Sequence, residues 1–536
     1  MTMKPWRAGL LTGAGLLAGI ATFALSAGAA QAASPPNALV IGTNLGAVPS
    51  LDPAAINART PSEVVSNLYD NLVQLAPTKL DTILPMLAES WSASEDKRTI
   101  TMVLRKGATF SSGNPVTAED AAWSIQRVIK MGAVGSTDVA LWGFTPENVE
   151  SLVQAKDPQT LVIKLPEPVS IELVLYSLAG ASLGIVDKKT ALQNEKNGDL
   201  AQNWLKANSA GSGPYKLTQW RPNDILLCDA RTDYWGGAPA MRRVVMRHVP
   251  ESGNMRLQIE ADDIDVGQYM ANGDLEALQA KGATIDPGAG LGFYYIAMNT
   301  KDPDLAKPLV RQAFQHILDW KPLASTTMNF NGFPWQSIIP KGMPGSPAGD
   351  PTGYQYDPDL ARKLLAEAGY PNGLKKVLFP SSDALLKMAV ALQASARKAG
   401  VEFEIVPGEH TPDFRARKFE VLVGNSGSRL PDPFGTLVQY AYNPDNRDEA
   451  KLGGYYLWRT AYNAPDLTKL VDQSKGETDP AKRQALFEQV DKGFKDMAPP
   501  LIVFLQRTDP YAIRKSVSGY VGHPTWSTRW AGVTKK

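Results

Sequence analysis

Residues 85–120 read PMLAESWSASEDKRTITMVLRKGATFSSGNPVTAED, and this stretch decides how the rest of the chain is interpreted. Within it, Gly107, Gly113 and Pro115 are typical of a hairpin-like turn, because glycine tolerates unusual backbone angles and proline restricts its own. Thr117 follows at once and is succeeded by two acids, which is a common beginning for a helix. The stretch therefore predicts a tight turn that leads directly into a helix.

The helix is predicted to continue to Gly132, because apolar side chains recur at helical spacing through TAEDAAWSIQRVIKMG (117–132). A second helix is expected within YDPDLARKLLAEAGYPNGL (356–374), capped by Asp357 or Asp359, and a third from Asp479 to Phe494. The buried face of the second helix is expected to consist of Leu360, Leu364 and Leu365.

Such helical patterns alternate with short strand-like runs, for example ALVIGTN at 38–44, and this alternation predicts lobes of the α/β class. The chain has 536 residues, which exceeds what one hydrophobic core usually supports, so we expect at least two lobes. The composition, 43% hydrophobic and 20% charged, is ordinary for a soluble globular protein.

The first 32 residues have the pattern of a secretory signal peptide. Lys4 and Arg7 provide positive charge, residues 10–25 are apolar, and small residues precede a cleavage site after Ala32. A membrane anchor is the alternative, but the apolar segment is short and interrupted by glycines. We expect export to the periplasm and removal of this segment.

Charge and cysteine content narrow the possible functions. The formal charge is +1, and removal of the signal peptide with its two basic residues brings it to about −1, so nucleic acid is not an expected partner. Cys228 is the only cysteine, so no intramolecular disulfide can form, and no cysteine at the cleavage site could accept a lipid. We expect a monomeric periplasmic protein that is not a lipoprotein.

Eight segments follow one another in order along the chain: SNLYDNLVQL (66–75), the stretch 85–120, GSGPYKLTQW (211–220), TDYWGGAPAMRRVVMRHVPE (232–251), ADDID (261–265), YYIAMNT (294–300), VRQAFQHILD (310–319) and YDPDLARKLLAEAGY (356–370). This series resembles the peptide, nickel and opine class of ABC-transporter solute-binding proteins from the periplasm, their family 5 (cluster C). The resemblance covers essentially the whole chain after the signal peptide.

The resemblance implies an α/β, two-lobed periplasmic-binding-protein fold of type II, the Venus-flytrap fold, with an extra inserted subdomain. Two crossings between the lobes are expected at 288–299 and 498–511, where glycine- or proline-containing segments enter apolar runs. The expected division after the signal peptide (1–32) is lobe I at 33–72, the inserted subdomain at 73–209, lobe I again at 210–293, lobe II at 294–499 and lobe I at 500–536.

The same resemblance implies the substrate-binding component of an ABC importer, which captures a small solute between its lobes and delivers it to the permease in the inner membrane. Ligand would contact both lobes only in the closed form and would therefore favour closure. Three alternatives remain open: a di- or oligopeptide receptor, a periplasmic partner of a membrane sensor, and an exported hydrolase that uses a pair of acids.

The stretch EVLVGNSGSRLPDPF (420–434) bears on the solute. In peptide-binding relatives a carboxylate that holds the peptide amino group precedes an Asp-Pro pair. Alignment on Asp432-Pro433 places Arg429 where that carboxylate stands, and Ser426 where an aromatic residue stands. This implies a pocket of reversed charge that favours a carboxylate, phosphate or sulfonate, with a surface ion pair between Arg429 and Asp432 as the alternative. Other contacts expected from this stretch are Asn425, Gly427 and Ser428.

Further ligand contacts are implied by position in the family pattern, mostly aromatic residues that can stack on a solute with little loss of entropy. For each of them, packing in the core is an equal alternative. These candidates are Asn44, Leu45, Trp142, Phe293, Tyr294, Tyr455, Trp458 and Arg459.

Two cofactor-binding motifs are not found in the sequence. It contains no G-x-G-x-x-G dinucleotide pattern and no phosphate-binding P-loop. The four histidines, His248, His316, His410 and His523, are far apart, which argues against a histidine metal site. We expect a binding protein without catalytic residues, bound metal or cofactor.

Overall fold

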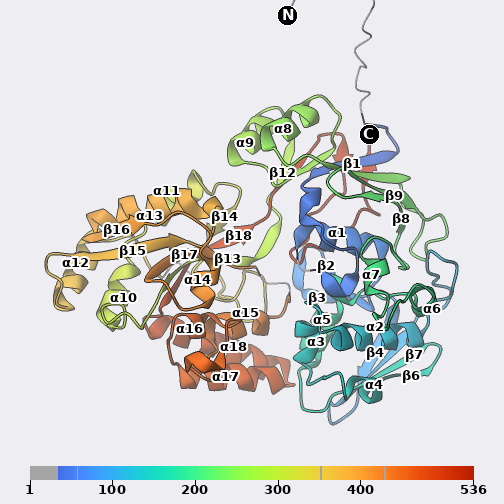
Figure 1. Ribbon diagram of the computed structural model, residues 1–536, viewed down its shortest axis with the longest axis horizontal. Coiled ribbons are helices and arrows are strands. Elements are labelled where there is room, and N and C mark those ends of the chain that lie inside the picture. The colour runs from blue at the N-terminus through green and yellow to red at the C-terminus, as the bar shows by residue number, and fades with distance from the viewer. Residues whose placement is uncertain (1–33, 57, 350–352, 428–429) are drawn as a thin grey trace, which may run out of the picture.

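The computed structural model describes residues 34–56, 58–349, 353–427 and 430–536, which form two α/β lobes side by side (Figure 1). The right lobe in this view contains both ends of the described chain, and the left lobe contains the orange segments and part of the red ones from the second half of the sequence. The two-lobed α/β arrangement expected from the sequence is confirmed.

The main sheet of the right lobe is built around β1, whose six residues are all buried. β1 pairs in parallel with β10 and β11, which suits the continuous apolar run ALVIGT of a central strand. The strands lie in the order β12 (Thr284–Asp286), β19 (Tyr511–Ile513), β11 (Val266–Gln268), β1 (Ala38–Thr43), β10 (Arg243–His248), β9 (Ile225–Ala230) and β8 (Tyr215–Arg221).

A smaller antiparallel sheet lies at the lower right of Figure 1, with α2 packed against it. Thr117 and Asp120 exchange hydrogen bonds at the start of α2 (Ala118–Met131), and Gly132 ends it with φ +56°, which confirms the predicted helix. Gly107 and Gly113 also have positive φ, as the predicted turn requires. The strands are β4 (Ala88–Ala93), β5 (Thr99–Leu104), β7 (Thr160–Lys164) and β6 (Val153–Asp157), and the neighbouring hairpin is β2 (Val73–Ala76) and β3 (Lys79–Pro85).

The sheet of the left lobe is mixed. β13 pairs antiparallel with both β17 and β18, whereas β15 pairs in parallel with β16 and β17. Its strands lie in the order β14 (Gly332–Pro334), β18 (Leu501–Thr508), β13 (Ala289–Met298), β17 (Val421–Asn425), β15 (Leu374–Pro380) and β16 (Val401–Ile405).

The chain passes between the lobes at two adjacent places. β12 of the right lobe is followed by β13 of the left lobe across residues 287–288, and β18 is followed by β19 across residues 509–510. The two crossings touch, because the Asp509 N–H donates to the Gly288 carbonyl (3.3 Å). The change of sheet therefore occurs outside β13 and β18, not at the boundaries 293/294 and 499/500 expected from the sequence, since both strands pair within the left sheet.

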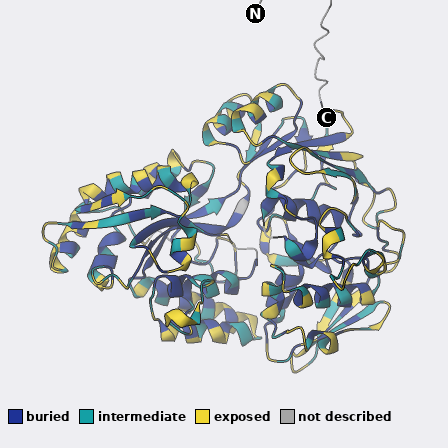
Figure 2. Cartoon of the chain, viewed as in Figure 1, coloured by how far each residue is buried: buried dark blue, intermediate teal, exposed yellow. Residues whose placement is uncertain are grey.

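Most of the helices that cover these sheets bury one face and expose the other (Figure 2), whereas all ten residues of α1 are buried. Those of the right lobe are α1 (Arg59–Leu68), α2, α3 (Ser136–Ala140), α4 (Val149–Leu152), α5 (Ile171–Leu178), α6 (Lys188–Gln193), α7 (Gln202–Leu205), α8 (Ser252–Glu260) and α9 (Asn272–Ala280). Those of the left lobe are α10 (Pro308–Phe314), α11 (Trp320–Ser325), α12 (Pro358–Glu367), α13 (Leu386–Lys398), α14 (Thr411–Arg415), α15 (Pro433–Ala441), α16 (Tyr456–Arg459), α17 (Pro465–Gly476) and α18 (Pro480–Asp496).

Helix α12 begins as predicted, because the Asp357 carboxylate accepts from the Leu360 N–H (2.9 Å). The predicted buried stripe is wrong in part: Ala361 and Leu365 are buried, Leu364 is half-buried, and Leu360 is exposed. Ala361 and Leu365 join the core that also contains Phe314 of α10, so the face of α12 is set by its partner helix.

Short ends complete the architecture. β20 (Val517–Ser518) pairs with β21 (Thr534–Lys535) near the C-terminus. The segment between them contributes Tyr520, Trp530 and Val533 to the same hydrophobic core as β1. The C-terminal residues therefore belong structurally to the right lobe, although the preceding strand β18 lies in the left one.

Candidate functional site

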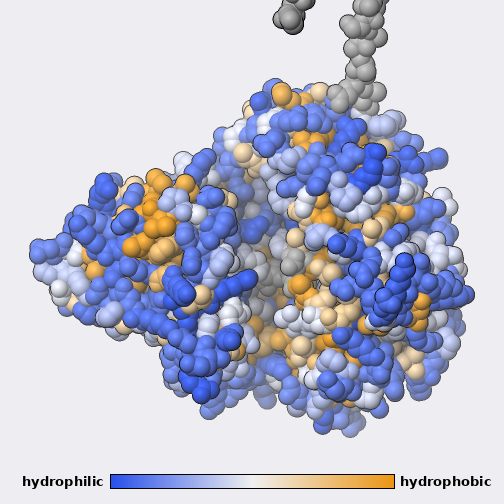
Figure 3. Space-filling view, viewed as in Figure 1, coloured by the Kyte–Doolittle hydropathy of each residue, from blue (hydrophilic) through white to orange (hydrophobic). Residues whose placement is uncertain are grey.

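A hollow of about 410 Å³ lies where the ends of β15 and β17 meet α14, α15, α16 and the C-terminal segment. We call it the interlobe pocket, and the surface is deeply hollowed between the two lobes in Figure 3. Its described lining residues are Tyr295, Ser381, Ser382, Thr411, Phe414, Arg415, Asn425, Ser426, Gly427, Gln439, Tyr456, Arg459, Arg507 and Trp526.

The end of β17 forms one wall because small residues follow its buried part. A Cβ on Gly424 would lie 2.7 Å from the ring of Tyr295, and a Cβ on Gly427 would lie 3.5 Å from Trp526. Glycine at position 424 thus leaves space for the aromatic ring beside the strand. At position 427 it brings the strand end close to the C-terminal segment of the other lobe.

Ser426 is held with its hydroxyl proton still available. Its oxygen accepts a hydrogen bond from the Phe293 N–H (3.0 Å) and another from the Tyr440 hydroxyl (2.8 Å). Two donors therefore occupy the oxygen, and the hydroxyl can donate its own proton to another group. Because Ser426 lines the pocket, a solute with an acceptor oxygen could receive that hydrogen bond.

Aromatic rings form the floor beneath these residues. Tyr456 packs edge-on or tilted against Tyr440 (5.0 Å between ring centroids), Tyr295 (5.2 Å) and Phe414 (5.4 Å). Burial raises the pKa of Tyr295 and of Tyr440 well above the ordinary value, so both hydroxyls remain protonated. The floor is thus closely packed and its tyrosines are uncharged.

Arg459 on α16 is the unusual charge of the site. Its side chain is buried, with only 7% of the residue exposed, and its guanidinium lies over the rings of Tyr456 (4.5 Å) and Phe414 (4.8 Å). Nε donates to the Gly453 carbonyl (2.8 Å), and no described acid lies within ion-pair distance. Burial lowers the pKa of Arg459, which nevertheless stays charged because arginine does not deprotonate in proteins.

Two more arginines line the same pocket. Arg415 is exposed at the end of α14, and within the described part of the chain its side chain has no hydrogen-bonding partner. Arg507, at the end of β18, donates to Asp509 (2.7 Å), and the indole N–H of Trp526 donates to the same acid (2.9 Å). Burial alone would raise the pKa of Asp509, but the nearby arginines outweigh burial and leave it lowered.

No acid is found among the described lining residues, whereas three arginines are. Asp509 lies behind the wall and is already bound to Arg507. Uncompensated positive charge in a partly dehydrated space attracts an anion strongly, because water screens the interaction less than it does in bulk solution. The described lining of the interlobe pocket is therefore suited to an anion and poorly suited to a cation.

The structure brings four of the sequence-predicted residues into this pocket: Asn425, Ser426, Gly427 and Arg459. Ser428 and Arg429 lie outside the described residues. Asp432 is the partner suggested for Arg429 in the alternative interpretation. It is fully buried, and its carboxylate accepts hydrogen bonds from both terminal nitrogens of Arg483 (2.7 and 2.9 Å). The Asp432 carboxylate therefore has a strong partner of its own.

Three candidates from the right lobe lie elsewhere. Asn44 caps the short helix Leu45–Ala47 by accepting from the Gly46 N–H (3.0 Å), and Leu45 itself is in the core. Trp142 is fully buried and packs edge-on against Phe144 (5.6 Å). Leu45 and Trp142 are therefore packed in the core and do not line the interlobe pocket.

Phe293 and Tyr294, the two candidates at the first crossing, are adjacent on β13 and therefore point to opposite faces of the sheet. Phe293 packs against Tyr440 (5.7 Å), and Tyr294 belongs to the core on the opposite face of the sheet. The next residue, Tyr295, reaches the pocket instead. Successive side chains of a strand point to opposite faces, so a choice between adjacent tyrosines depends on which face of the sheet meets the cleft.

The candidates around α16 are also divided, because some of their side chains pack within the lobe and others line the pocket. The ring of Tyr455 packs on Tyr442 (5.1 Å), and the Trp458 indole lies on Arg417 (3.9 Å) and donates to a carbonyl. Tyr456 and Arg459, three positions apart on one helical face, line the pocket. Of the four aromatic or basic residues in this segment, only these two face the solute space.

Several lining residues were missed by sequence reasoning. Ser381 and Ser382 follow the apolar end of β15 as Ser426 follows that of β17, and parallel strands end at the same edge of a sheet. That signal could have found them. Arg507 and Trp526 are 19 residues apart in sequence and belong to different lobes, and no local pattern marks them.

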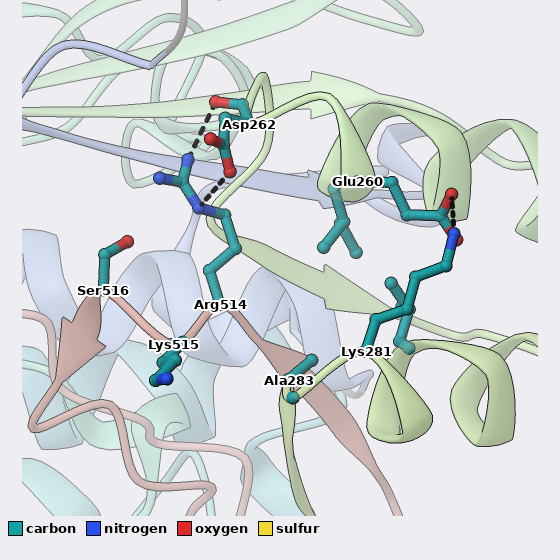
Figure 4. A pocket seen from close by; sticks show the side chains of 10 residues that line it. Glu260, Asp262, Lys281, Ala283, Arg514, Lys515 and Ser516 are labelled. Carbon is teal, nitrogen blue, oxygen red and sulfur yellow. Dashed lines mark hydrogen bonds and ion pairs between the residues drawn. The ribbon is translucent and has the colours of Figure 1, made fainter.

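A second hollow, of about 620 Å³, lies on the outer surface of the right lobe beside α8 and α9 (Figure 4). Its charges are largely matched within the protein. Arg514 pairs with Asp262 (3.1 Å) and Asp265 (3.2 Å), and Lys281 pairs with Glu260 (2.7 Å). This outer hollow is larger than the interlobe pocket, and among its basic lining residues only the exposed Lys515 has no described acid within ion-pair distance.

Comparison with known proteins places the chain among binding proteins. The model of a family described as bacterial extracellular solute-binding proteins, family 5 Middle, matches residues 82–448. A probable D,D-dipeptide-binding periplasmic protein, DdpA of Escherichia coli K12, is 29% identical over 507 residues and is covered to 93%, with 92% of this chain covered.

Solved structures share the fold. The periplasmic binding protein DppA from Helicobacter pylori, in complex with the peptide STSA, has a TM-score of 0.74 at 24% identity, with 93% of this chain and 98% of that chain covered. The binding protein MoaA from A. tumefaciens R10, in complex with mannopinic acid, has a TM-score of 0.73 at 22% identity, with 94% and 100% covered. These similarities confirm the two-lobed periplasmic-binding-protein fold. Within the described residues, no helix has the length and apolar character needed to span a membrane.

Proposed function

The chain belongs to the bacterial extracellular solute-binding proteins of family 5, and from this premise we propose that it serves an ABC importer and takes an anionic solute. The observation that carries the second part is Arg459, a buried guanidinium that faces the interlobe pocket without a described acid as partner. A carboxylate, phosphate or sulfonate of the solute supplies the missing charge.

The physical reason is the energy of a buried charge. A buried ion without a counter-ion costs several kcal/mol relative to water. In the open protein, water entering the pocket reduces this cost for Arg459. Closure of the lobes would remove that water, so closure is favourable only when an anion accompanies it, which couples ligand binding to the closed form.

Other contacts of the proposed site follow from its geometry. The Ser426 hydroxyl, whose oxygen already accepts two hydrogen bonds, donates its proton to an oxygen of the solute. Tyr456, Phe414 and Trp526 provide apolar surface for the rest of the solute. Ser428 and Arg429 are proposed as further contacts, because they continue the chain directly from Gly427, which lines the pocket. The prediction from the sequence is that Arg429→Ala weakens binding at least tenfold.

The cellular setting that we propose combines the sequence pattern with the periplasmic location of relatives. The chain is exported, cleaved after Ala32, and acts as a soluble periplasmic monomer without a lipid anchor, nucleic-acid partner or catalytic activity. It delivers its solute to permease subunits in the inner membrane. We also propose that the lobes move as units about the crossings at 287–288 and 509–510.

A peptide receptor is the second candidate, and the D,D-dipeptide-binding relative favours it. A peptide has a C-terminal carboxylate that Arg459 could hold, but its ammonium group would need an acid. Because no described lining residue is acidic, the amino terminus would have to lie outside the interlobe pocket. N-acetylated peptides distinguish the two functions, since acetylation removes the ammonium charge and leaves the carboxylate.

The test is a thermal-shift screen of the periplasmic protein with small organic anions, free peptides and N-acetylated peptides, followed by calorimetry on the best ligand. A ligand at 100 times its Kd adds about 2.7 kcal/mol of apparent stability. We expect anions to stabilise the protein and Arg459→Gln to weaken binding at least tenfold, with Arg362→Gln on the exposed face of α12 as the matched control. Stabilisation by free peptides alone, or an unchanged affinity of Arg459→Gln, would contradict the proposal.

A further inference from the structure

Buried arginines elsewhere in the described chain are matched within the protein, and this makes the charge of the interlobe pocket unusual. Several are paired with acids: Arg127 with Asp52, Arg231 with Asp233, Arg417 with Asp448 and Arg483 with Asp432. Arg311 and Arg59 have no described acid within ion-pair distance. Arg311 donates to the carbonyl oxygens of Ala498, Leu305 and Ala306, and Arg59 donates to the Tyr511 hydroxyl (3.2 Å) and the Pro510 carbonyl (3.1 Å). The general pattern is that a buried guanidinium has its donors satisfied.

Arg459 departs from that pattern. Only its Nε donates, to the Gly453 carbonyl (2.8 Å), so its two terminal nitrogens make no hydrogen bond to any described residue. A carboxylate or phosphate typically binds to such a fork with two parallel hydrogen bonds. Arg459 thus provides a complete subsite for one anionic group.

Arg415 provides a second positive charge next to the first. Its Cβ lies 3.9 Å from the position that a Cβ on Gly453 would occupy, and Gly453 is the residue whose carbonyl binds Arg459. The charge of Arg415 acts to lower the pKa of Arg459, as expected for two cations that repel one another. Both guanidinium groups therefore face the same space without a described counter-ion.

Arg507 serves as an internal comparison, because it lines the same pocket and is matched. Its partner Asp509 is 7% exposed and also accepts from the Trp526 indole. The protein has therefore balanced one of the three pocket arginines with an acid of its own and left two. A solute with a single negative charge would leave one positive charge uncompensated when the cleft closes.

We propose that the natural solute carries two negative charges toward Arg415 and Arg459, either as two carboxylates or as one phosphate monoester. The inference rests on the proposed function of the same pocket and adds the number of charges to it. Asn425 and Gln439 support a polar solute, because both line the pocket and neither side chain makes a hydrogen bond to a described residue. Their amide groups can donate to the additional oxygens of a dianion.

The experiment uses probes that differ in charge and hardly in shape. Calorimetry on the periplasmic protein compares glutarate with its half-amide glutaramate and its diamide, and N-acetyl-glutamate with N-acetyl-glutamine. Glycerol 3-phosphate forms a second arm, because a phosphate monoester carries about −1.5 to −2 charges at neutral pH. We expect at least one dianion to bind tenfold or more tightly than its singly charged counterpart.

Arg415→Gln is the decisive variant, because Arg415 is exposed and its replacement should leave the fold intact. We expect this variant to bind a dianion no better than the matching monoanion, whereas Arg362→Gln keeps the full preference. Preferential binding of the phosphate monoester alone would assign both charges to one group and would still support the proposal.

The outcomes separate this inference from the proposed function. Equal affinity for half-amide and diacid in the unmodified protein would overturn the dianion proposal and leave an anionic solute. Stabilisation by neutral or cationic compounds, with none from any mono- or dianion, would overturn both. A dianion preference that persists in Arg415→Gln would also contradict the inference, because the second charge would then be recognised elsewhere.

Discussion

The outer hollow beside α8 and α9 is larger than the interlobe pocket, yet its arrangement of charge is the opposite. In the outer hollow, Arg514 and Lys281 each have an acid of the protein within 3.2 Å. In the interlobe pocket, Arg459 is buried with both terminal nitrogens unmatched among the described residues. Volume alone would favour the outer hollow over the interlobe pocket, whereas unmatched buried charge favours the one between the lobes as the candidate site.

The same contrast exists within the left lobe. Arg483 and Arg459 are buried to a similar degree, at 4% and 7% exposure, but only Arg483 has an acid, Asp432, bound through two hydrogen bonds. A matched pair stabilises the fold, because removal of either member leaves the other as a buried charge without a partner. An unmatched arginine at a pocket remains available for an anionic ligand instead.

The largest effect is expected from breaking the matched pair. Asp432→Ala leaves Arg483 as a buried charge without a partner and removes the cap of α15, whose Phe434 N–H the acid accepts (2.9 Å). Loss of one partner of a buried pair costs about 3–5 kcal/mol of unfolding free energy. Urea denaturation measures this, with Asp359→Ala of the exposed Arg362 pair as the control. A loss under 1 kcal/mol would show that the pair is not structural.

The unmatched arginine should respond in the opposite way. Arg459→Met removes a buried charge that lacks a described acid and replaces it by an apolar chain of similar length, so the ligand-free protein should not lose stability. Affinity for the solute should fall by about 2–4 kcal/mol, within the range for truncating one partner of a buried charge pair. Urea denaturation without ligand and calorimetry with ligand test the two halves. A strongly destabilised ligand-free variant would indicate a structural role.

His523 sharpens the comparison, because a buried histidine can lose its proton whereas a buried arginine cannot. It lies in the C-terminal segment that carries Trp526, where Nδ1 accepts from the Thr525 N–H (3.2 Å) and Nε2 faces the Leu75 carbonyl (3.3 Å). Burial lowers the pKa of His523 from 6.5 to about 4. The unfolded chain therefore binds more protons than the folded chain between these values.

It follows that the stability contributed by neutral His523 is present above pH 6.5 and is lost as the pH falls toward 4. A shift of this size corresponds to about 3 kcal/mol between the two ends of the window. Melting temperatures of the unmodified protein and of His523→Gln across this range measure it. The variant should lose less stability on acidification, and an identical slope for both proteins would refute the assignment.

The smallest effect is expected at the outer hollow. Exposed Lys281 pairs with half-buried Glu260 at the protein surface, and surface pairs contribute about 0–1 kcal/mol. Lys281→Gln should change neither stability beyond this range nor affinity for the solute. A loss of solute affinity in this variant, measured by calorimetry beside Arg459→Gln, would show that the outer hollow takes part in binding after all.

Much of the fold could be predicted from the sequence, because its signals are local. The Thr117–Asp120 cap and Gly132 mark the two ends of α2 within one stretch of chain. The apolar runs of β1 and β17 end in small polar residues, which identified Asn425, Ser426 and Gly427 as candidates for the pocket. The buried face of α12 was predicted less well, because it depends on contact with α10.

The sequence predicted which strand ends and helices lie near the pocket better than it predicted which of two adjacent side chains faces the pocket. Ser426 was found from the end of its strand, but Tyr295 and Tyr456 were missed in favour of their neighbours Tyr294 and Tyr455. A one-residue step reverses the face of a strand and turns a helical side chain by about 100°. Sequence reasoning located three of the segments that line the pocket, in β13, β17 and α16, but could not orient their side chains toward a cleft whose position depends on the rest of the fold.

The sequence by itself determined the class of the protein: strand and helix patterns, turn glycines and the ordered family segments that predict two α/β lobes. Only the tertiary structure decided the charge of the pocket. Arg459, Arg507 and Trp526 meet there from distant parts of the chain, and Asp509 balances one arginine while none of the described acids pairs with Arg459. The reason is physical: helix caps and strand alternation depend on residues a few positions apart, whereas charge balance depends on distances in space.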